Sequence, residues 1–93
     1  MRRRTEDDEG RAANAARFRR VWLQYLPVDM DQEELQAITG YYGTVVDFML
    51  FKKRGCSVAW VEYETQRQAN EAVEELDERD IEGWNMLIKA IRL

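Results

Sequence analysis

Residues 58–63 constrain the fold most, because β-branched and aromatic side chains alternate there as they do in a β-strand. Period-two alternation divides the segment into a core face, with Ala59, Val61 and Tyr63, and an outward face, with Val58, Trp60 and Glu62. A domain of 93 residues has little with which to cover Trp60. An outward tryptophan on a sheet therefore indicates a surface that stacks a planar ligand.

The length of the chain suits one small domain with a single core in two layers. The sequence has no apolar run of membrane length and no apolar segment of signal-peptide type. Cys56 is the only cysteine and histidine is absent, so neither a disulfide framework nor a zinc cluster is expected. This cysteine usage is typical of a reduced, intracellular compartment. No nucleophile has a base and no glycine-rich loop could cradle phosphate, so we expect no enzyme activity, no catalytic residues, no cofactor and no metal.

The net charge of −4 conceals an asymmetry along the chain. Residues 1–20 contain seven arginines against four acids, whereas residues 21–93 contain seven basic residues against fourteen acids. A pI near 4.9 argues against a generally basic surface of the kind that binds nucleic acid. Attraction to phosphate must therefore come from local basic clusters.

The rest of the chain predicts a polar, flexible leader over residues 1–18 and five further elements. Strands are expected at 20–26, 44–51 and 86–91, a basic turn at 52–55, and helices after Asp29 or Asp31 and from Thr65. The first helix would bury Leu35, Ile38 and Tyr42. The resulting order is βαββαβ, an α+β sandwich in which two helices cover one face of a four-stranded antiparallel sheet.

Alternation in the first strand predicts a second outward tryptophan. It puts Val21, Leu23 and Tyr25 on the buried face and Trp22 and Gln24 on the outward face. Two tryptophans on strands of one sheet form an apolar surface, and surfaces of that kind generally bind a partner.

With these elements in hand, residues 19–93 resemble the RNA-recognition motif, a family with a ferredoxin-like fold. The six-residue signature of its first strand resembles residues 21–26, and the eight-residue signature of its third strand resembles residues 56–63. The small and apolar residues of the second helix and fourth strand also match the pattern of this family. The short turn at 52–55 resembles the compact hairpins of SR-type splicing proteins and mRNA-export adaptors.

The match to the family signatures is uneven. Trp22 and Trp60 occupy two of the three stacking positions of the family, but Val58 occupies the third and cannot stack a base. Cys56 and its neighbour Ser57 replace a basic residue and a glycine, and Tyr25 stands where asparagine is usual.

The resemblance implies that single-stranded RNA lies across the sheet, with bases stacked on the two tryptophans. The implied contacts on the sheet face are Trp22, Gln24, Met49, Phe51, Val58, Trp60 and Glu62. The implied phosphate contacts are Lys52, Lys53 and Arg54 in the turn, Lys89 on the last strand, and Arg17, Arg19 and Arg20 near the first strand. The carboxylate of Glu62 would repel phosphate, or would accept a hydrogen bond from a base amino group.

Two alternatives remain open from the sequence. In the first, the fold binds a protein partner through its apolar sheet face or its acidic helices. The peptide-capturing variant of the family carries Arg-x-Phe before its fourth strand, and it is disfavoured because residues 84–86 of this chain are Trp-Asn-Met. In the second, the chain is a purely structural subunit of a ribonucleoprotein. The resemblance implies a nuclear protein in mRNA processing, such as splicing, and no association with a membrane.

Overall fold

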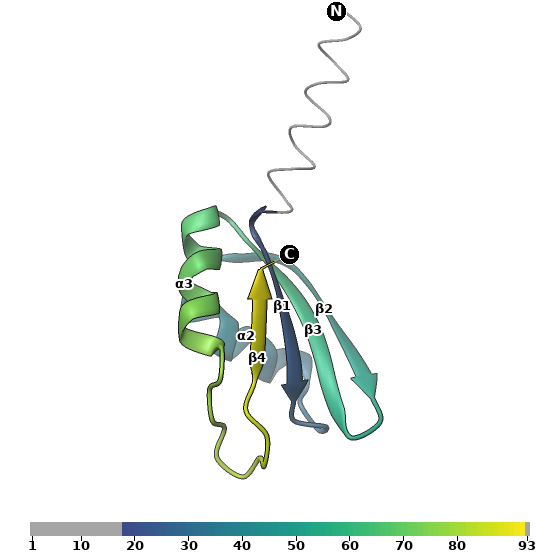
Figure 1. Ribbon diagram of the computed structural model, residues 1–93. Helices are drawn as coiled ribbons and strands as arrows, with labels where there is room; N and C mark the ends of the chain where they lie inside the picture. Colours follow the sequence, from purple (N-terminus) through teal and green to yellow (C-terminus); the bar gives the residue numbers. More distant parts are fainter. Residues whose placement is uncertain (1–17, 93) are drawn as a thin grey trace, which may run out of the picture.

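The computed structural model describes residues 18–92, in which two helices cover one face of a four-stranded antiparallel sheet (Figure 1). In chain order the elements are β1 (Arg20–Leu26), α2 (Gln32–Gly40), β2 (Val45–Lys53), β3 (Cys56–Tyr63), α3 (Gln66–Leu76) and β4 (Lys89–Arg92). The strands are arranged β2-β3-β1-β4, so the two strands with family-like signatures are central. The predicted βαββαβ order is confirmed, whereas the predicted leader, apart from Phe18, lies outside the described residues.

Both helices begin at capping residues that the sequence indicated. The side chain of Asp31 accepts a hydrogen bond from the backbone N–H of Glu34 at 2.8 Å, which satisfies a free donor of the first turn of α2. Thr65 and Gln68 form a capping box at the start of α3. Each helix therefore begins at a position specified by its own sequence.

The core lies in one layer between the helices and the sheet. On β3 the predicted core residues Ala59, Val61 and Tyr63 are fully buried, as the alternation requires. The hydroxyl of Tyr63 donates a hydrogen bond to the backbone carbonyl of Thr39 at 2.7 Å. This bond satisfies the polar end of an otherwise apolar side chain in the middle of the core.

The β2–β3 hairpin is tighter than the sequence suggested. Residues 52–55 were expected to form the turn, but Lys52 and Lys53 continue β2 and pair with Ser57 and Cys56. The turn itself contains Arg54 and Gly55, and Gly55 has φ of +86°. A residue without Cβ takes this left-handed conformation at little cost, which allows such a short connection.

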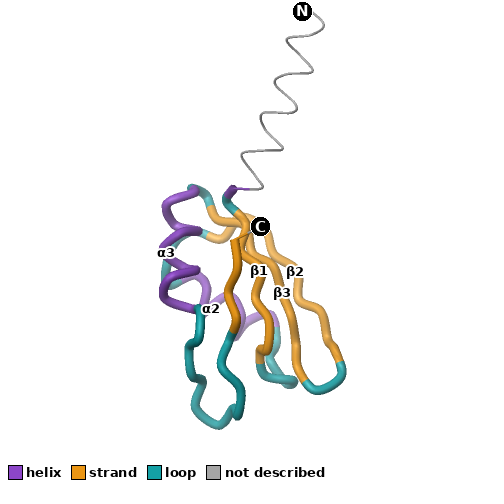
Figure 2. Tube along the Cα trace, viewed as in Figure 1, coloured by secondary structure: helices purple, strands orange, loops and turns teal. Residues whose placement is uncertain are grey.

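The last strand is shorter than predicted and begins later. Strand β4 starts at Lys89, whereas the apolar run predicted a strand over residues 86–91. Leu87 forms a bridge to Asp80, and the N–H of Ile88 donates to the carbonyl of Arg79. The beginning of the predicted strand therefore pairs with the segment after α3 and not with β1, within the long α3–β4 connection in Figure 2.

A bulge near the end of β1 overturns the predicted orientation of Tyr25. Leu23 pairs with Ala59 and Leu26 with Ser57, so three steps along β1 correspond to two along β3. The extra residue allows Leu26 to enter the core, and Tyr25 is 46% exposed with φ of +61°. The prediction that Tyr25 lies on the buried face is wrong, because simple alternation does not continue through a bulge.

Candidate functional site

A row of apolar side chains crosses the sheet on the side opposite the helices. Trp22 on β1 pairs with Trp60 on β3, and the row continues to Met49 on β2 and Ile91 on β4. The two tryptophans are half-buried, and Met49 and Ile91 are exposed. We call the surface formed by this row and its neighbours of the same orientation the outer face: Trp22, Gln24, Met49, Phe51, Val58, Trp60, Glu62, Lys89 and Ile91.

Val58 is a small, buried residue beside the aromatic side chains of the outer face. The ring centroids of Trp22 and Phe51 are 6.3 Å apart, although their strands are separated by β3. The rings therefore meet above β3, where Phe51 pairs with Val58. Val58 is only 7% exposed and does not belong to the core cluster, as expected of a residue that has the orientation of the outer face. A small side chain at this position allows Trp22 and Phe51 to approach one another.

Glu62 on β3 forms ion pairs with two arginines, one just before β1 and one at its beginning. Arg19 Nη2 lies 3.1 Å from Glu62 Oε2, and Arg20 Nε lies 2.9 Å from Glu62 Oε1. Because Glu62 is only 9% exposed and carries one charge against two, the cluster is net positive. The sequence left two roles open for this carboxylate, repelling phosphate or accepting a hydrogen bond from a base. In the structure it pairs with two guanidinium groups.

Arg20 also covers part of the stacking surface. Its guanidinium carbon lies 4.4 Å from the centroid of the Trp60 ring, which is the geometry of a cation–π contact. The side chain of Arg20 therefore contacts both residues, because it stacks on the ring of Trp60 and pairs with the carboxylate of Glu62.

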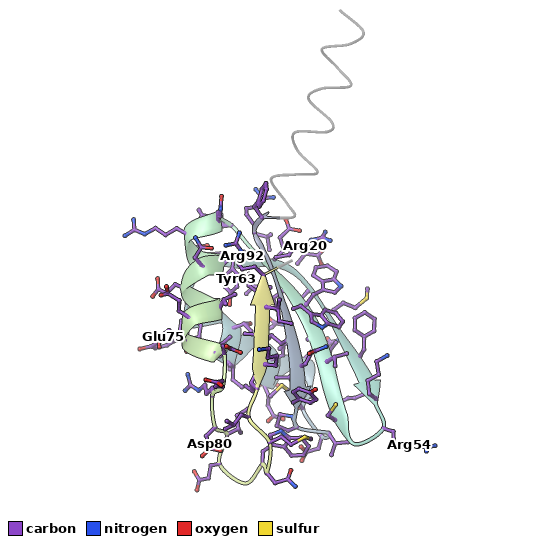
Figure 3. All side chains as sticks on the ribbon, in the orientation of Figure 1. Arg20, Arg54, Tyr63, Glu75, Asp80 and Arg92 are labelled. Carbon is purple, nitrogen blue, oxygen red and sulfur yellow. The ribbon has the colours of Figure 1, made fainter. Side chains whose placement is uncertain are left out.

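The three basic residues of the hairpin do not form one cluster. The ammonium of Lys52 donates to the carbonyls of Val28 and Met30 in the β1–α2 connection, so Lys52 ties the hairpin to that loop. Lys53 has the strand orientation of the outer face, two residues beyond Phe51. Arg54 points away from the tip of the hairpin, and Figure 3 shows it at the end of the sheet opposite Arg20. The predicted contacts Gln24 and Lys89 are paired on β1 and β4, and Arg17 lies outside the described residues.

This arrangement suits the binding of a planar, anionic chain. Aromatic rings occupy the centre of the outer face, and cationic groups lie at both of its ends, as base stacking and phosphate contacts require. Within residues 18–92 no group of three His, Cys, Asp or Glu side chains could hold a metal ion. In the same part of the chain, no helix has the length and apolarity needed to cross a bilayer.

Sequence reasoning missed two exposed residues near this surface. Ile91 shares its face with Lys89 by the ordinary period of a strand, so alternation in β4 could have found it. Tyr25 was missed because of the bulge. The bulge could have been anticipated from the asparagine that the RNA-recognition motif usually carries at this position. Asparagine is one of the few residues that readily adopt positive φ, the conformation of Tyr25 here.

Comparison with known proteins agrees with this geometry. The family model described as RNA recognition motif matches residues 21–87. No curated protein matches the chain. Among solved structures, the Sxl-lethal protein/RNA complex superposes with a TM-score of 0.73 at 23% identity, over 85% of this chain and 50% of that one.

Two further structures have the same fold. The Rna15 RRM with bound RNA (GU) gives a TM-score of 0.70 at 22% identity, over 81% of this chain and 82% of that one. The C. elegans NONO-1 homodimer gives 0.73 at 22% identity, over 85% of this chain and 30% of that one. The chain therefore spans about half of the Sxl-lethal chain and less than a third of the NONO-1 chain. At these identities the likeness demonstrates a common fold.

Proposed function

The chain belongs to the RNA recognition motif family, and on that premise we propose that it binds single-stranded RNA across its outer face. The observation that carries the proposal is the pairing of Trp22 with Trp60 on the two central strands. Two large rings side by side offer platforms for two bases, and each stacked base contributes about 1–3 kcal/mol. The residues responsible are Trp22 and Trp60, with Met49, Phe51 and Ile91 extending the apolar surface.

Arg20 changes partner when RNA binds, in this proposal. In the free protein its guanidinium occupies one face of Trp60 and pairs with Glu62. A base that stacks on that face displaces the guanidinium, which then pairs with a phosphate of the same strand. Arg19 stays on Glu62, so the carboxylate keeps a partner and no buried charge is left alone.

Affinity is expected to be modest. Residues 21–93 carry an excess of seven acids, which opposes the approach of a polyanion. Lys53, Arg54 and Lys89 offset this repulsion only locally. We therefore expect other domains or subunits to contribute to binding in the full assembly.

The test is a titration of short homopolymer RNAs against Trp22→Ala and Trp60→Ala, followed by fluorescence anisotropy of labelled RNA. We expect each substitution to weaken binding by about 5- to 150-fold, the loss of one stacked base. Neither tryptophan belongs to the core cluster, so both variants should keep a cooperative thermal transition. Tyr41→Ala is the matched control, since Tyr41 is 84% exposed beside a helix. Wild-type affinity in both tryptophan variants would reject the proposal.

A second candidate function is supported by the helical side of the molecule. A groove there is lined by residues of α2, α3 and the segments that follow them: Ala37, Ile38, Tyr41, Tyr42, Glu71, Glu75 and Arg79. Its exposed tyrosine and two glutamates suit a basic protein segment that carries an apolar residue. A basic partner that binds the domain and loses affinity with Tyr41→Ala would favour this function.

We further propose that the domain acts in mRNA processing, within a nuclear ribonucleoprotein. The support is the two-residue hairpin turn, which resembles the compact hairpins of SR-type splicing and mRNA-export adaptor proteins. Crosslinking of the protein to RNA in cells, followed by sequencing, tests the proposal. Enrichment of unspliced or newly spliced transcripts is expected, and enrichment of mature cytoplasmic RNA alone would contradict it.

A further inference from the structure

Tyr25 has a backbone conformation that a tyrosine rarely adopts. Its φ of +61° lies in the left-handed region, where the Cβ of an L-residue crowds the following carbonyl. Glycine or asparagine would occupy this position with less strain. A bulky residue held in this conformation suggests that its side chain has a use in that orientation.

The bulge places Tyr25 outside the core, next to Gln24 on β1. Leu23 and Leu26 are both buried on the core side, and the two residues between them, Gln24 and Tyr25, are half-buried and exposed. Two consecutive residues of a bulged strand share one side of the sheet, whereas residues of a regular strand alternate. Tyr25 thus stands next to Gln24, which belongs to the outer face.

A hydrogen bond from a distant loop supports this conformation. The indole N–H of Trp84 donates to the backbone carbonyl of Tyr25 at 2.8 Å. Trp84 lies in the α3–β4 connection, which reaches the same end of the sheet as the end of β1 (Figure 2). The contact anchors the bulge through the backbone, and Tyr25 remains 46% exposed.

We propose that Tyr25 provides a third stacking platform, for a base of the same RNA strand that covers Trp22 and Trp60. This inference rests on the proposed function and extends its binding site. Tyr25 follows Trp22 by three positions, about 10 Å along a strand, which places the two residues in succession along one path. Lys89, the partner of Gln24, lies beside this path and is exposed for a phosphate contact.

The proposal also accounts for the missing aromatic residue at position 58. Val58 has no ring and is only 7% exposed, so it offers a base no stacking surface. Tyr25 restores a third ring at the far end of β1. The strand of RNA would then extend beyond the centre of the sheet toward the α3–β4 connection.

The experiment compares a two-nucleotide and a five-nucleotide oligouridine as probes, with Tyr25→Ala, Tyr25→Phe and the control Tyr41→Ala. Trp22 and Trp60 suffice for the dinucleotide, so its affinity should not change in any of these variants. The pentanucleotide should bind Tyr25→Ala about 5-fold or more weakly, and Tyr25→Phe as tightly as the wild type, because phenylalanine keeps the ring. Unchanged pentanucleotide affinity in Tyr25→Ala would overturn the proposal, as would an equal loss in Tyr25→Phe.

Thermal unfolding separates stacking from a structural role. Tyr25→Asn should melt at or above the wild-type Tm, because asparagine tolerates positive φ, and should still lose pentanucleotide affinity. A lower Tm in Tyr25→Asn with pentanucleotide affinity unchanged would make Tyr25 a structural residue and overturn the proposal. If Trp22→Ala and Trp60→Ala also leave the binding of both probes unchanged, the proposed function itself fails.

Discussion

At the scale of single residues, the charged groups beside Trp60 on the outer face are paired with one another: Glu62 with Arg19 and Arg20. Glu62 was predicted from alternation to lie beside Trp60, and the structure confirms that position. Its two arginine partners could not be predicted, because alternation gives the face of a residue but not which side chains reach one another. The same limit applies to Tyr25, whose bulge changes the face itself.

Glu62→Gln should strengthen RNA binding at low salt. The substitution removes one negative charge from the outer face and releases the guanidinium of Arg20 from its ion pair. We expect a higher affinity, measured by anisotropy, with the slope of log Kd against log salt unchanged because Arg20 contacts phosphate in both complexes. A lower affinity would mean that the Glu62 carboxylate accepts a hydrogen bond from a base. Glu75→Gln, on α3, is the matched control and should leave the affinity unchanged.

At the scale of elements, the order, the helix caps and the core face follow from local sequence signals. Each depends on a few neighbouring residues, such as Thr65 and Gln68 at the start of α3. The ends of β2 and β4 were less predictable, because hydrogen bonds between distant segments decide them. The bridge from Leu87 to Asp80 is one such interaction, and it shortens β4.

The hairpin offers a test of strand orientation with two adjacent lysines. Lys52 donates to carbonyls of the β1–α2 connection, whereas Lys53 has the orientation of the outer face. Lys53→Ala should therefore weaken RNA binding and lower the salt slope by about 0.7, the value for one phosphate contact on a single strand. Lys52→Ala should lower the Tm and leave that slope unchanged. Equal slopes in both variants and the wild type would show that neither lysine contacts phosphate.

At the scale of the whole molecule, the core places a tyrosine hydroxyl where water cannot reach it. Burial raises the pKa of Tyr63 far above its ordinary value, and nearby Tyr42 raises it further. The folded core destabilises the ionised tyrosinate of Tyr63, so the unfolded chain releases this proton at lower pH than the folded protein. The stability of the domain is therefore linked to pH in the alkaline range.

The free energy of unfolding should be insensitive to the Tyr63 hydroxyl up to about pH 10, the ordinary pKa of tyrosine. As the pH rises further toward the raised folded pKa, this group should remove roughly 1.4 kcal/mol per pH unit. Urea denaturation at pH 8 and at about pH 11 measures the difference. Tyr63→Phe should be less stable than the wild type at both pH values, because the hydrogen bond to Thr39 is gone. The decrease in its free energy of unfolding from pH 8 to about pH 11 should, however, be smaller than that of the wild type. An identical pH dependence in Tyr63→Phe would contradict this account.

The most direct test of the account is a map of backbone amide chemical shifts by NMR during titration with a short single-stranded RNA. The account predicts that the largest changes occur in β1 and β3, around the paired Trp22 and Trp60, with smaller changes at Lys53 and Lys89. The groove between α2 and α3, on the opposite side of the molecule, should be unaffected. Changes confined to that groove, or no changes at all, would contradict the claim that the outer face binds RNA.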